Sequence, residues 1–457
     1  MAGLPSSETV QWSSKFAFTM AAVGSSVGLG NLWRFSAELG TNGGAAFLVV
    51  YIACIIFVGI PVLMSEFMIG RAGLASSAVG SQTDLAIRSN VSKGWSGGAW
   101  FGMIASFLIV SFYCVVAAWV LNYLVRFLGN GFQGLSAESI AQQFPDMLAD
   151  PLGKESGVVK AVWPYFFIFA GITTWLVARG VNKGIETAAK LLMPLFFILL
   201  IGLAAYSLIT GMQSGGTAQA FSFMFTPDFS KITPAVATSA LGQACFSIGI
   251  GNAIMITYGS YLPRSVSIPK AAVTISLVDT LVAITAGLAI FPIVFTHGLN
   301  SAGGAGLFFQ TLPTALADFW YIGAAFFFLA FFAAITSSVS LLEPSVAYVA
   351  EKFKLTKAKA AWLTGGAITF VGLFSLMSPA FFDFIDTGLA GPILAPLSAL
   401  LIVLFTGWRL SKTIIAQEIA GEGEALGRFI LFFVKYVAPL FMGFVLVRGI
   451  LQRYFGI

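Results

Sequence analysis

Long apolar segments alternate with shorter polar stretches along the whole chain. Most of these segments reach the length of roughly 20 residues that a helix needs to cross a bilayer. The pattern predicts eleven membrane-spanning helices, at residues 13–38, 44–70, 95–127, 162–179, 187–211, 236–261, 268–296, 320–351, 357–377, 381–408 and 426–450. Among the connections, 71–94 is expected to hold a surface helix at Ser81–Ser92, and Gly303–Gly306 with Pro313 indicates a re-entrant or lid-like loop within 297–319.

The first apolar segment contains a candidate break, AVGSSVGLGNLWRF at Ala22–Phe35. Glycine weakens a helix and lets other atoms approach the backbone. A break leaves backbone N–H and C=O groups unpaired inside the membrane unless they line a polar cavity. We therefore expect a polar ligand, with carbonyls facing a cation or ammonium group and the following helix N-terminus facing a carboxylate. A glycine-lined helix contact is the alternative, but it does not account for Asn31 and Arg34.

A second break is predicted in the sixth segment, LGQACFSIGIGNAIMITYGSY, which contains Gly249, Gly251 and Asn252. If residues 13–211 and 236–408 are five-helix repeats of opposite topology, the two breaks meet near the middle of the bilayer, as in transporters. The helix at 426–450 then follows the second repeat, and residues 1–457 form a single transporter domain.

Composition and charge agree with an all-α polytopic membrane protein. Apolar residues make up 58% of the 457 residues, charged residues 9%, and the mean hydropathy is +0.91. The three cysteines all lie in apolar segments, which argues against a disulfide framework or a metal cluster. Lys and Arg gather in alternate connections, and the opposite ones keep only Lys154, Lys160 and Lys231. This bias predicts a cytoplasmic N-terminus and an outside C-terminus.

Ionisable residues inside membrane helices mark functional sites. Asp279, in ISLVDTLVAI, has no basic residue near it in its segment, so a metal ion is the expected partner. A protonated Asp279 bonded to a neighbouring helix is the alternative. The nearby oxygen-bearing residues suit a hard cation such as Na⁺ rather than zinc or a redox metal. Glu66 and Glu343 are expected to accept hydrogen bonds from backbone N–H groups freed by the breaks.

Several motifs resemble the neurotransmitter:sodium symporter family, in particular its prokaryotic members with eleven helices. The resemblance runs through GSSVGLGNLWRF, TNGGAAFLVVY, PVLMSEFMIGR, SFYCVVAAW, SIGIGN with TYGSY, AAITSSVSLLEP and FDFIDTGLAGP, and covers essentially the whole chain. It implies the LeuT-type fold with two inverted five-helix repeats, broken helices 1 and 6, and sodium-coupled uptake of an amino acid across a bacterial inner membrane. It implies no enzymatic activity, no organic cofactor and no nucleic-acid partner.

The resemblance also implies site residues. One sodium site would use Gly24, Val27, Ala333, Thr336 and Ser337, and the other Ser26, Asn31, Ser247, Asp279 and the substrate carboxylate. The substrate would contact Ser26, Leu29, Gly30, Ile109, Tyr113, Phe246, Ser247, Gly249, Asn252, Ser337, Ser340 and Leu341. The outer gate would consist of Phe246 beneath an Arg34–Asp386 pair.

Some positions refine this expectation. Gly24 replaces the aspartate of monoamine-carrying relatives, which favours a substrate with its own carboxylate. Asp279 and Ala283 replace the asparagine and serine of chloride-dependent animal members, so we expect a fixed carboxylate to make chloride unnecessary. Gly249 and Asn252 predict a wider, more polar side-chain pocket than that of the leucine-binding member.

The inner gate departs from the family pattern. The family often pairs an N-terminal arginine with an acidic residue at the end of helix 8. The corresponding positions here are Thr9 and Glu351, with Lys15 as a candidate substitute for the arginine.

Two other functions are alternatives, of which the first uses the same site. One is an amino-acid sensor or ligand-gated conductance without tight coupling, which flux stoichiometry would distinguish from a symporter. The other is an intramembrane serine hydrolase relying on His297, but no G-x-S-x-G motif supports it.

Overall fold

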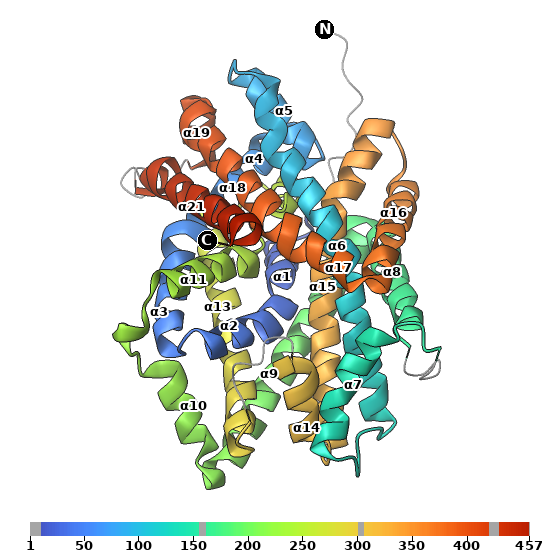
Figure 1. Cartoon of the computed structure of the whole chain (residues 1–457). Helices are drawn as coiled ribbons and strands as arrows, with labels where there is room; N and C mark the ends of the chain where they lie inside the picture. Colours follow the sequence, from blue (N-terminus) through green and yellow to red (C-terminus); the bar gives the residue numbers. More distant parts are fainter. Residues whose placement is uncertain (1–10, 155–160, 300–305, 420–428, 457) are drawn as a thin grey trace.

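The computed structural model describes residues 11–154, 161–299, 306–419 and 429–456, and within them the chain is helical and contains no β-strand (Figure 1). The first half contains α1 (Lys15–Ser26), η1 (Gly30–Arg34), α2 (Phe35–Thr41), α3 (Ala45–Cys54), η2 (Ile55–Gly59), α4 (Ile60–Ala72), α5 (Ala78–Arg88), η3 (Lys93–Ser96), α6 (Gly97–Leu128), α7 (Ala137–Ala149), α8 (Trp163–Ala178), η4 (Val181–Glu186), α9 (Thr187–Ser214) and α10 (Gly216–Phe225).

The second half begins after the short turn η5 (Phe229–Lys231). It contains α11 (Pro234–Ile248), α12 (Ile254–Ser260), α13 (Ile268–Thr296), η6 (Leu307–Thr311), α14 (Leu312–Leu316), α15 (Trp320–Phe353), α16 (Lys357–Met377), α17 (Pro379–Asp383), η7 (Phe384–Leu394), α18 (Ala395–Leu404), η8 (Phe405–Arg409), α19 (Lys412–Glu418), η9 (Phe433–Val437), α21 (Ala438–Ile450) and η10 (Leu451–Phe455).

All eleven predicted ranges contain helix, and the two predicted breaks are present. Among the described residues, eight helical stretches are long and apolar enough to cross a membrane. The other three ranges hold the two broken helices and α8, which has 16 residues. Length and composition therefore identify eight of the eleven predicted crossings, and the count of eleven stays a prediction. Residues 426–428 of the last predicted range lie outside the described residues.

Local sequence signals set several helix starts. The Ser14 side chain caps α1 by accepting from the Ala17 N–H, and the Thr233 side chain caps α11 by accepting from the Val236 N–H. These hydroxyls satisfy N–H groups that have no partner inside the helix. Pro234 then occupies the first turn of α11, where its missing N–H costs nothing.

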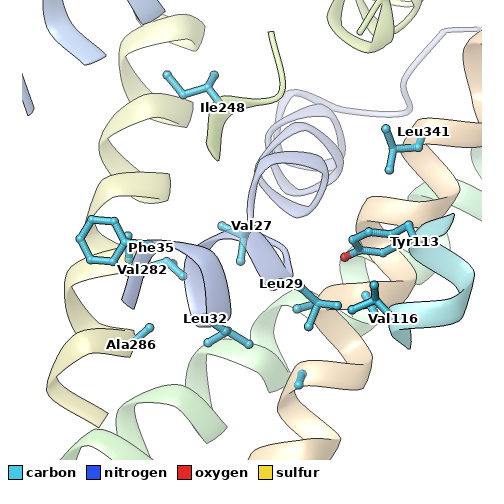
Figure 2. Close-up of a cluster of buried hydrophobic side chains, with 14 of the residues drawn as sticks. Val27, Leu29, Leu32, Phe35, Tyr113, Val116, Ile248, Val282, Ala286 and Leu341 are labelled. Atoms are coloured by element: carbon cyan, nitrogen blue, oxygen red, sulfur yellow. The ribbon is translucent and has the colours of Figure 1, made fainter. Parts of the chain in front are cut away.

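Two long helices, α6 and α15, form the centre of the bundle. In the most apolar part of each helix, 78% of the residues are buried for the stretch that ends in α6 and 83% for α15. The corresponding share is 22% for the last stretch, Phe429–Phe455. The broken helix α1–η1 lies beside α15 and places Val27 and Leu29 opposite Tyr113 of α6 (Figure 2). The innermost helices are thus the ones that surround the breaks.

The connections carry helices of their own. The surface helix expected in 71–94 is α5, at one end of the bundle, whereas α7, α10 and α14 lie at the opposite end (Figure 1). We call these ends the α5 face and the α7 face. The expected lid-like loop contains η6 and α14. Phe309 of η6 stacks on Phe144 of α7, with 4.8 Å between the ring centroids. Residues 300–305, including Gly303, lie outside the described residues.

Candidate functional site

The two helix breaks lie side by side in the interior. α1 ends at Ser26, where the extended Val27 follows, and α11 ends at Ile248 before the left-handed Gly249 and Gly251. The Ser26 hydroxyl donates to the Ile248 carbonyl at 3.3 Å. The backbone groups released by one break are therefore satisfied partly by the other.

Neighbouring helices satisfy most of the remaining released groups. The Gly251 N–H donates to Glu66 Oε1 at 2.7 Å, which confirms the expected role of Glu66. Gln243 Nε2 donates to the Gly30 carbonyl at 3.2 Å, and the Ser106 hydroxyl donates to the Asn252 carbonyl. Glu343 differs from the expectation, because its described partners are the Tyr261 hydroxyl and the Lys357 ammonium rather than backbone N–H groups.

A buried carboxylate stands next to the first break. Asp279 of α13 is fully buried, and Asn31 Nδ2 donates to its Oδ1 at 2.8 Å. The Ser247 hydroxyl donates to Asp279 Oδ2 at 2.7 Å, and Tyr51 of α3 reaches the Ser247 hydroxyl at 3.2 Å. Within the described residues no Lys or Arg pairs with Asp279. This cluster of oxygens around a buried acid suits a hard cation.

A second group of oxygens lies between α1 and α15. The Ser337 hydroxyl is 3.3 Å from the Ser25 carbonyl and 3.5 Å from the Val27 carbonyl. The Thr336 hydroxyl lies 3.2 Å from the Ala333 carbonyl. A Cβ on Gly24 would come within 3.3 Å of the Thr336 side chain, so the five residues of this predicted sodium site are neighbours.

Several side chains between the two groups keep small accessible surfaces, and we call the space that they face the internal space. Ser26, Ile109, Tyr113, Asn252, Ser337 and Leu341 keep between 5% and 8% of their surface accessible, although each lies deep in the bundle. Gly30, Phe246 and Gly249 are partly exposed as well. The Tyr113 hydroxyl points toward the break at Val27–Leu29, near the Leu29 backbone and Ser337, and makes no hydrogen bond of ordinary geometry with any described residue (Figure 2). A buried hydroxyl without a partner indicates that a polar ligand completes this site.

Ser340 is placed differently from its neighbours. Only 1% of Ser340 is accessible, and its hydroxyl is engaged by the Tyr258 hydroxyl at 2.7 Å and the Thr336 carbonyl at 2.8 Å. The sequence did not indicate Tyr51 or Gln243, whose importance arises from contacts with residues far away in the chain.

Comparison with known proteins identifies the family. The model of the sodium:neurotransmitter symporter family matches residues 9–134 and 154–454. The chain belongs to this family. It is 34% identical to an uncharacterised sodium-dependent transporter, YhdH, of Bacillus subtilis, over 94% of this chain and 95% of that protein. An uncharacterised sodium-dependent transporter of Methanocaldococcus jannaschii is 32% identical over 95% of this chain and 89% of its own length.

Among solved structures, the chain is similar to MhsT in complex with L-phenylalanine. The TM-score is 0.85 at 37% identity, and the match covers 96% of this chain and 99% of MhsT. The protein is therefore a multi-pass, sodium-dependent membrane transporter with the LeuT-type fold, and not an enzyme.

The outer gate expected for this symporter fold is present only in part. The Arg34 guanidinium lies over the Phe246 ring, 4.3 Å from its centroid, and its Nε is 4.0 Å from Glu38. Arg34 and Asp386, both among the described residues, do not approach within 4.0 Å of each other. The Arg34–Asp386 pair stays a prediction.

At the α5 face, Trp12 and Ser13, which directly precede the capping residue of α1, bond to residues of other segments. Trp12 Nε1 donates to the Tyr258 carbonyl at 3.2 Å. The Ser13 N–H donates to Glu186 Oε2 at 3.1 Å, its hydroxyl donates to Oε1, and Lys190 Nζ lies 2.6 Å from Oε1. One signal in the sequence could have indicated this contact: Glu186 and Lys190 form an i,i+4 acid–base pair where η4 meets α9.

The positions of the family's inner gate have other contacts here. Glu351 Oε2 accepts from the backbone N–H groups of Ser76 and Ser77 at 2.9 and 2.8 Å, so it holds the turn before α5. Thr9 lies outside the described residues. Glu186 therefore contacts the N-terminal segment where the family pattern led us to expect Glu351.

Proposed function

We propose that this protein carries a neutral L-amino acid together with sodium by alternating access, without a requirement for chloride. The observation that supports this most directly is the meeting of two helix breaks beside the buried Asp279 and a small internal space. Broken helices of transporters bind substrate and coupling ions at such points.

The oxygen groups define two proposed sodium sites. The first combines the Ser26 carbonyl with Asn31, Ser247 and Asp279, and the second combines the Gly24, Val27 and Ala333 carbonyls with the Thr336 and Ser337 hydroxyls. Each set consists of hard oxygen donors, and the first adds a negative charge. The two sites lie on opposite sides of the break in helix 1, so sodium binding would fix the conformation of that break.

The substrate backbone fits the polar side of the internal space. Its carboxylate would meet the amides of Leu29 and Gly30 at the start of η1, together with the unpaired Tyr113 hydroxyl. Its ammonium group would meet the carbonyls near Ser26 and Phe246. The neutral amino-acid class is supported by MhsT, which was solved in complex with L-phenylalanine, and by Gly24, which offers no carboxylate for an amine.

Asp279 supports chloride independence. A carboxylate buried beside the first sodium site supplies the negative charge that a bound anion would otherwise provide. Protonation of Asp279 in the empty carrier would further allow a proton to return as the sodium ions are released.

Alternating access requires two gates. We propose that the two predicted five-helix repeats move against each other, with Arg34, Phe246 and Asp386 closing the outer side and the Trp12–Ser13 segment closing the inner side. The α5 face is then cytoplasmic and the α7 face external, in a bacterial inner membrane. This assignment follows the distribution of Lys and Arg.

Reconstituted vesicles test the function. Uptake of each radiolabelled amino acid is measured with an inward sodium gradient, with potassium in place of sodium, and with gluconate in place of chloride. Accumulation above equilibrium that requires sodium but not chloride supports the proposal. Sodium-dependent binding without accumulation would instead favour a sensor, and flux without fixed stoichiometry a conductance.

A further inference from the structure

Asn252 lies in the second break and borders the internal space of the site. Its accessible fraction is 8%, similar to that of Tyr113, and its Oδ1 is buried without a hydrogen-bond partner among the residues that the structure describes. An unpaired carboxamide in a protein interior is costly. A ligand that completes it would recover that cost.

The backbone around Asn252 is fixed by neighbouring helices. Glu66 of α4 accepts from the preceding Gly251 N–H at 2.7 Å, and Ser106 of α6 donates to the Asn252 carbonyl. Gly251 lies so close to α18 that a Cβ there would be 2.2 Å from the Ala395 carbonyl oxygen. The backbone that carries the carboxamide is therefore held in place before a ligand arrives, which lowers the entropic cost of a hydrogen bond to this side chain.

The space beside this loop is also open. A Cβ built on Gly249 meets no atom within 4 Å, whereas one on Gly30 would come within 2.8 Å of Phe246. The part of the site next to Gly249, three residues before Asn252, can therefore accept a longer side chain than the part next to Gly30.

We infer that Asn252 determines substrate specificity by hydrogen-bonding a polar group on the substrate side chain. The preferred substrates are then neutral amino acids with a hydrogen-bonding side chain, in preference to aliphatic or plain aromatic ones of the same shape. This inference rests on the proposed amino-acid transport and names the substrate class of the same site.

Matched pairs of amino acids test it. Sodium-dependent binding of tyrosine and phenylalanine, threonine and valine, and glutamine and methionine is measured on the purified full-length protein and on Asn252→Leu. The wild type is expected to bind the polar member of at least one pair about tenfold to a hundredfold more tightly, as expected for an otherwise unpaired buried group. In Asn252→Leu that ratio should fall to about one, with binding of the apolar member retained.

Gln243→Leu is the matched control. Gln243 also has a buried, unpaired side-chain oxygen, but it is fully enclosed and does not border the internal space. Its loss should change the affinity for both members of a pair equally. Asn252→Ser provides a second variant if the leucine variant does not fold.

Three results would overturn the inference: unchanged ratios in both Asn252 variants, an equal change of the ratio in Gln243→Leu, or wild-type preference for the apolar member of every pair. If the folded wild type binds no amino acid in sodium, the proposed function itself fails, which is a distinguishable outcome.

Discussion

Replacing Asp279 by asparagine isolates the contribution of its charge to sodium binding. Both carboxylate oxygens are already within hydrogen-bond distance of Asn31 and Ser247, at 2.8 and 2.7 Å. A cation bound among these residues lies within about 4 Å of the carboxylate. At that distance two unit charges attract by about 4 kcal/mol at an effective dielectric constant of about 20. Since about 1.4 kcal/mol corresponds to a factor of ten, sodium affinity should fall by up to about a thousandfold.

Asparagine at position 279 keeps one oxygen that can bind sodium but lacks the negative charge. A bound anion should therefore restore part of the lost sodium affinity. We expect chloride to restore part of the sodium affinity, and more of it in Asp279→Asn with Ala283→Ser. Ala283 is fully buried one helical turn further along α13, where a hydroxyl would add an anion ligand.

Sodium-titrated substrate binding in chloride and in gluconate measures both effects. Asp84→Asn serves as the control, because Asp84 is a partly exposed residue on α5 that pairs with Arg88. The reasoning is refuted if Asp279→Asn folds, keeps wild-type sodium affinity in gluconate and shows no response to chloride.

Three further substitutions test the breaks and the contacts at the α5 face. Glu186→Gln removes the charge that binds Ser13 and Lys190, which should weaken these contacts by about 1.5–3 kcal/mol. A cysteine introduced at Ala21 should then react faster with an aqueous thiol reagent. An unchanged rate would contradict the proposed closing of the inner side by the Trp12–Ser13 segment. Gly251→Ala should destabilise the protein by about 2–5 kcal/mol, because φ is +76° and the new Cβ would meet the Ala395 carbonyl. Thermal unfolding should show no such loss in Gly242→Ala, where the methyl meets nothing within 4 Å. Glu418→Gln should cost about 3–5 kcal/mol in the same assay, because the buried Glu418 pairs with Arg71 at 2.6 Å and also with Arg264; a midpoint equal to that of the wild type would rule this out.

Helix positions and breaks were predictable because their causes are local. The apolar lengths, Ser14 and Thr233 as capping residues, and the glycines at 24, 28, 30, 249 and 251 act within a few residues of one another. The buried charge of Asp279 was equally visible, since an acid in an apolar segment needs a partner. The family motifs then assigned partners that sequence spacing alone does not provide.

Contacts between distant segments were less predictable. Glu351 was expected at the inner gate, yet it caps the turn before α5, 275 and 274 positions away at Ser76 and Ser77. Glu186 contacts Ser13 across 173 positions. The hydroxyl of Ser340, which stays a predicted substrate contact, is engaged by Tyr258 across 82 positions. Only the packing of the helices determines which of several polar residues on one helix face reaches a given partner.

The sequence by itself determined that this protein is a helical membrane protein, where its helices break, and which residues carry charge inside it. These properties follow from hydrophobicity and backbone preferences, which each segment expresses independently. The tertiary structure decided that Asn31, Tyr51, Ser247 and Asp279 form one cluster, and that the side-chain oxygen of Asn252 has no hydrogen-bond partner among the described residues. Those contacts join helices far apart in the chain, so they exist only once the helices pack and fix the distances between them.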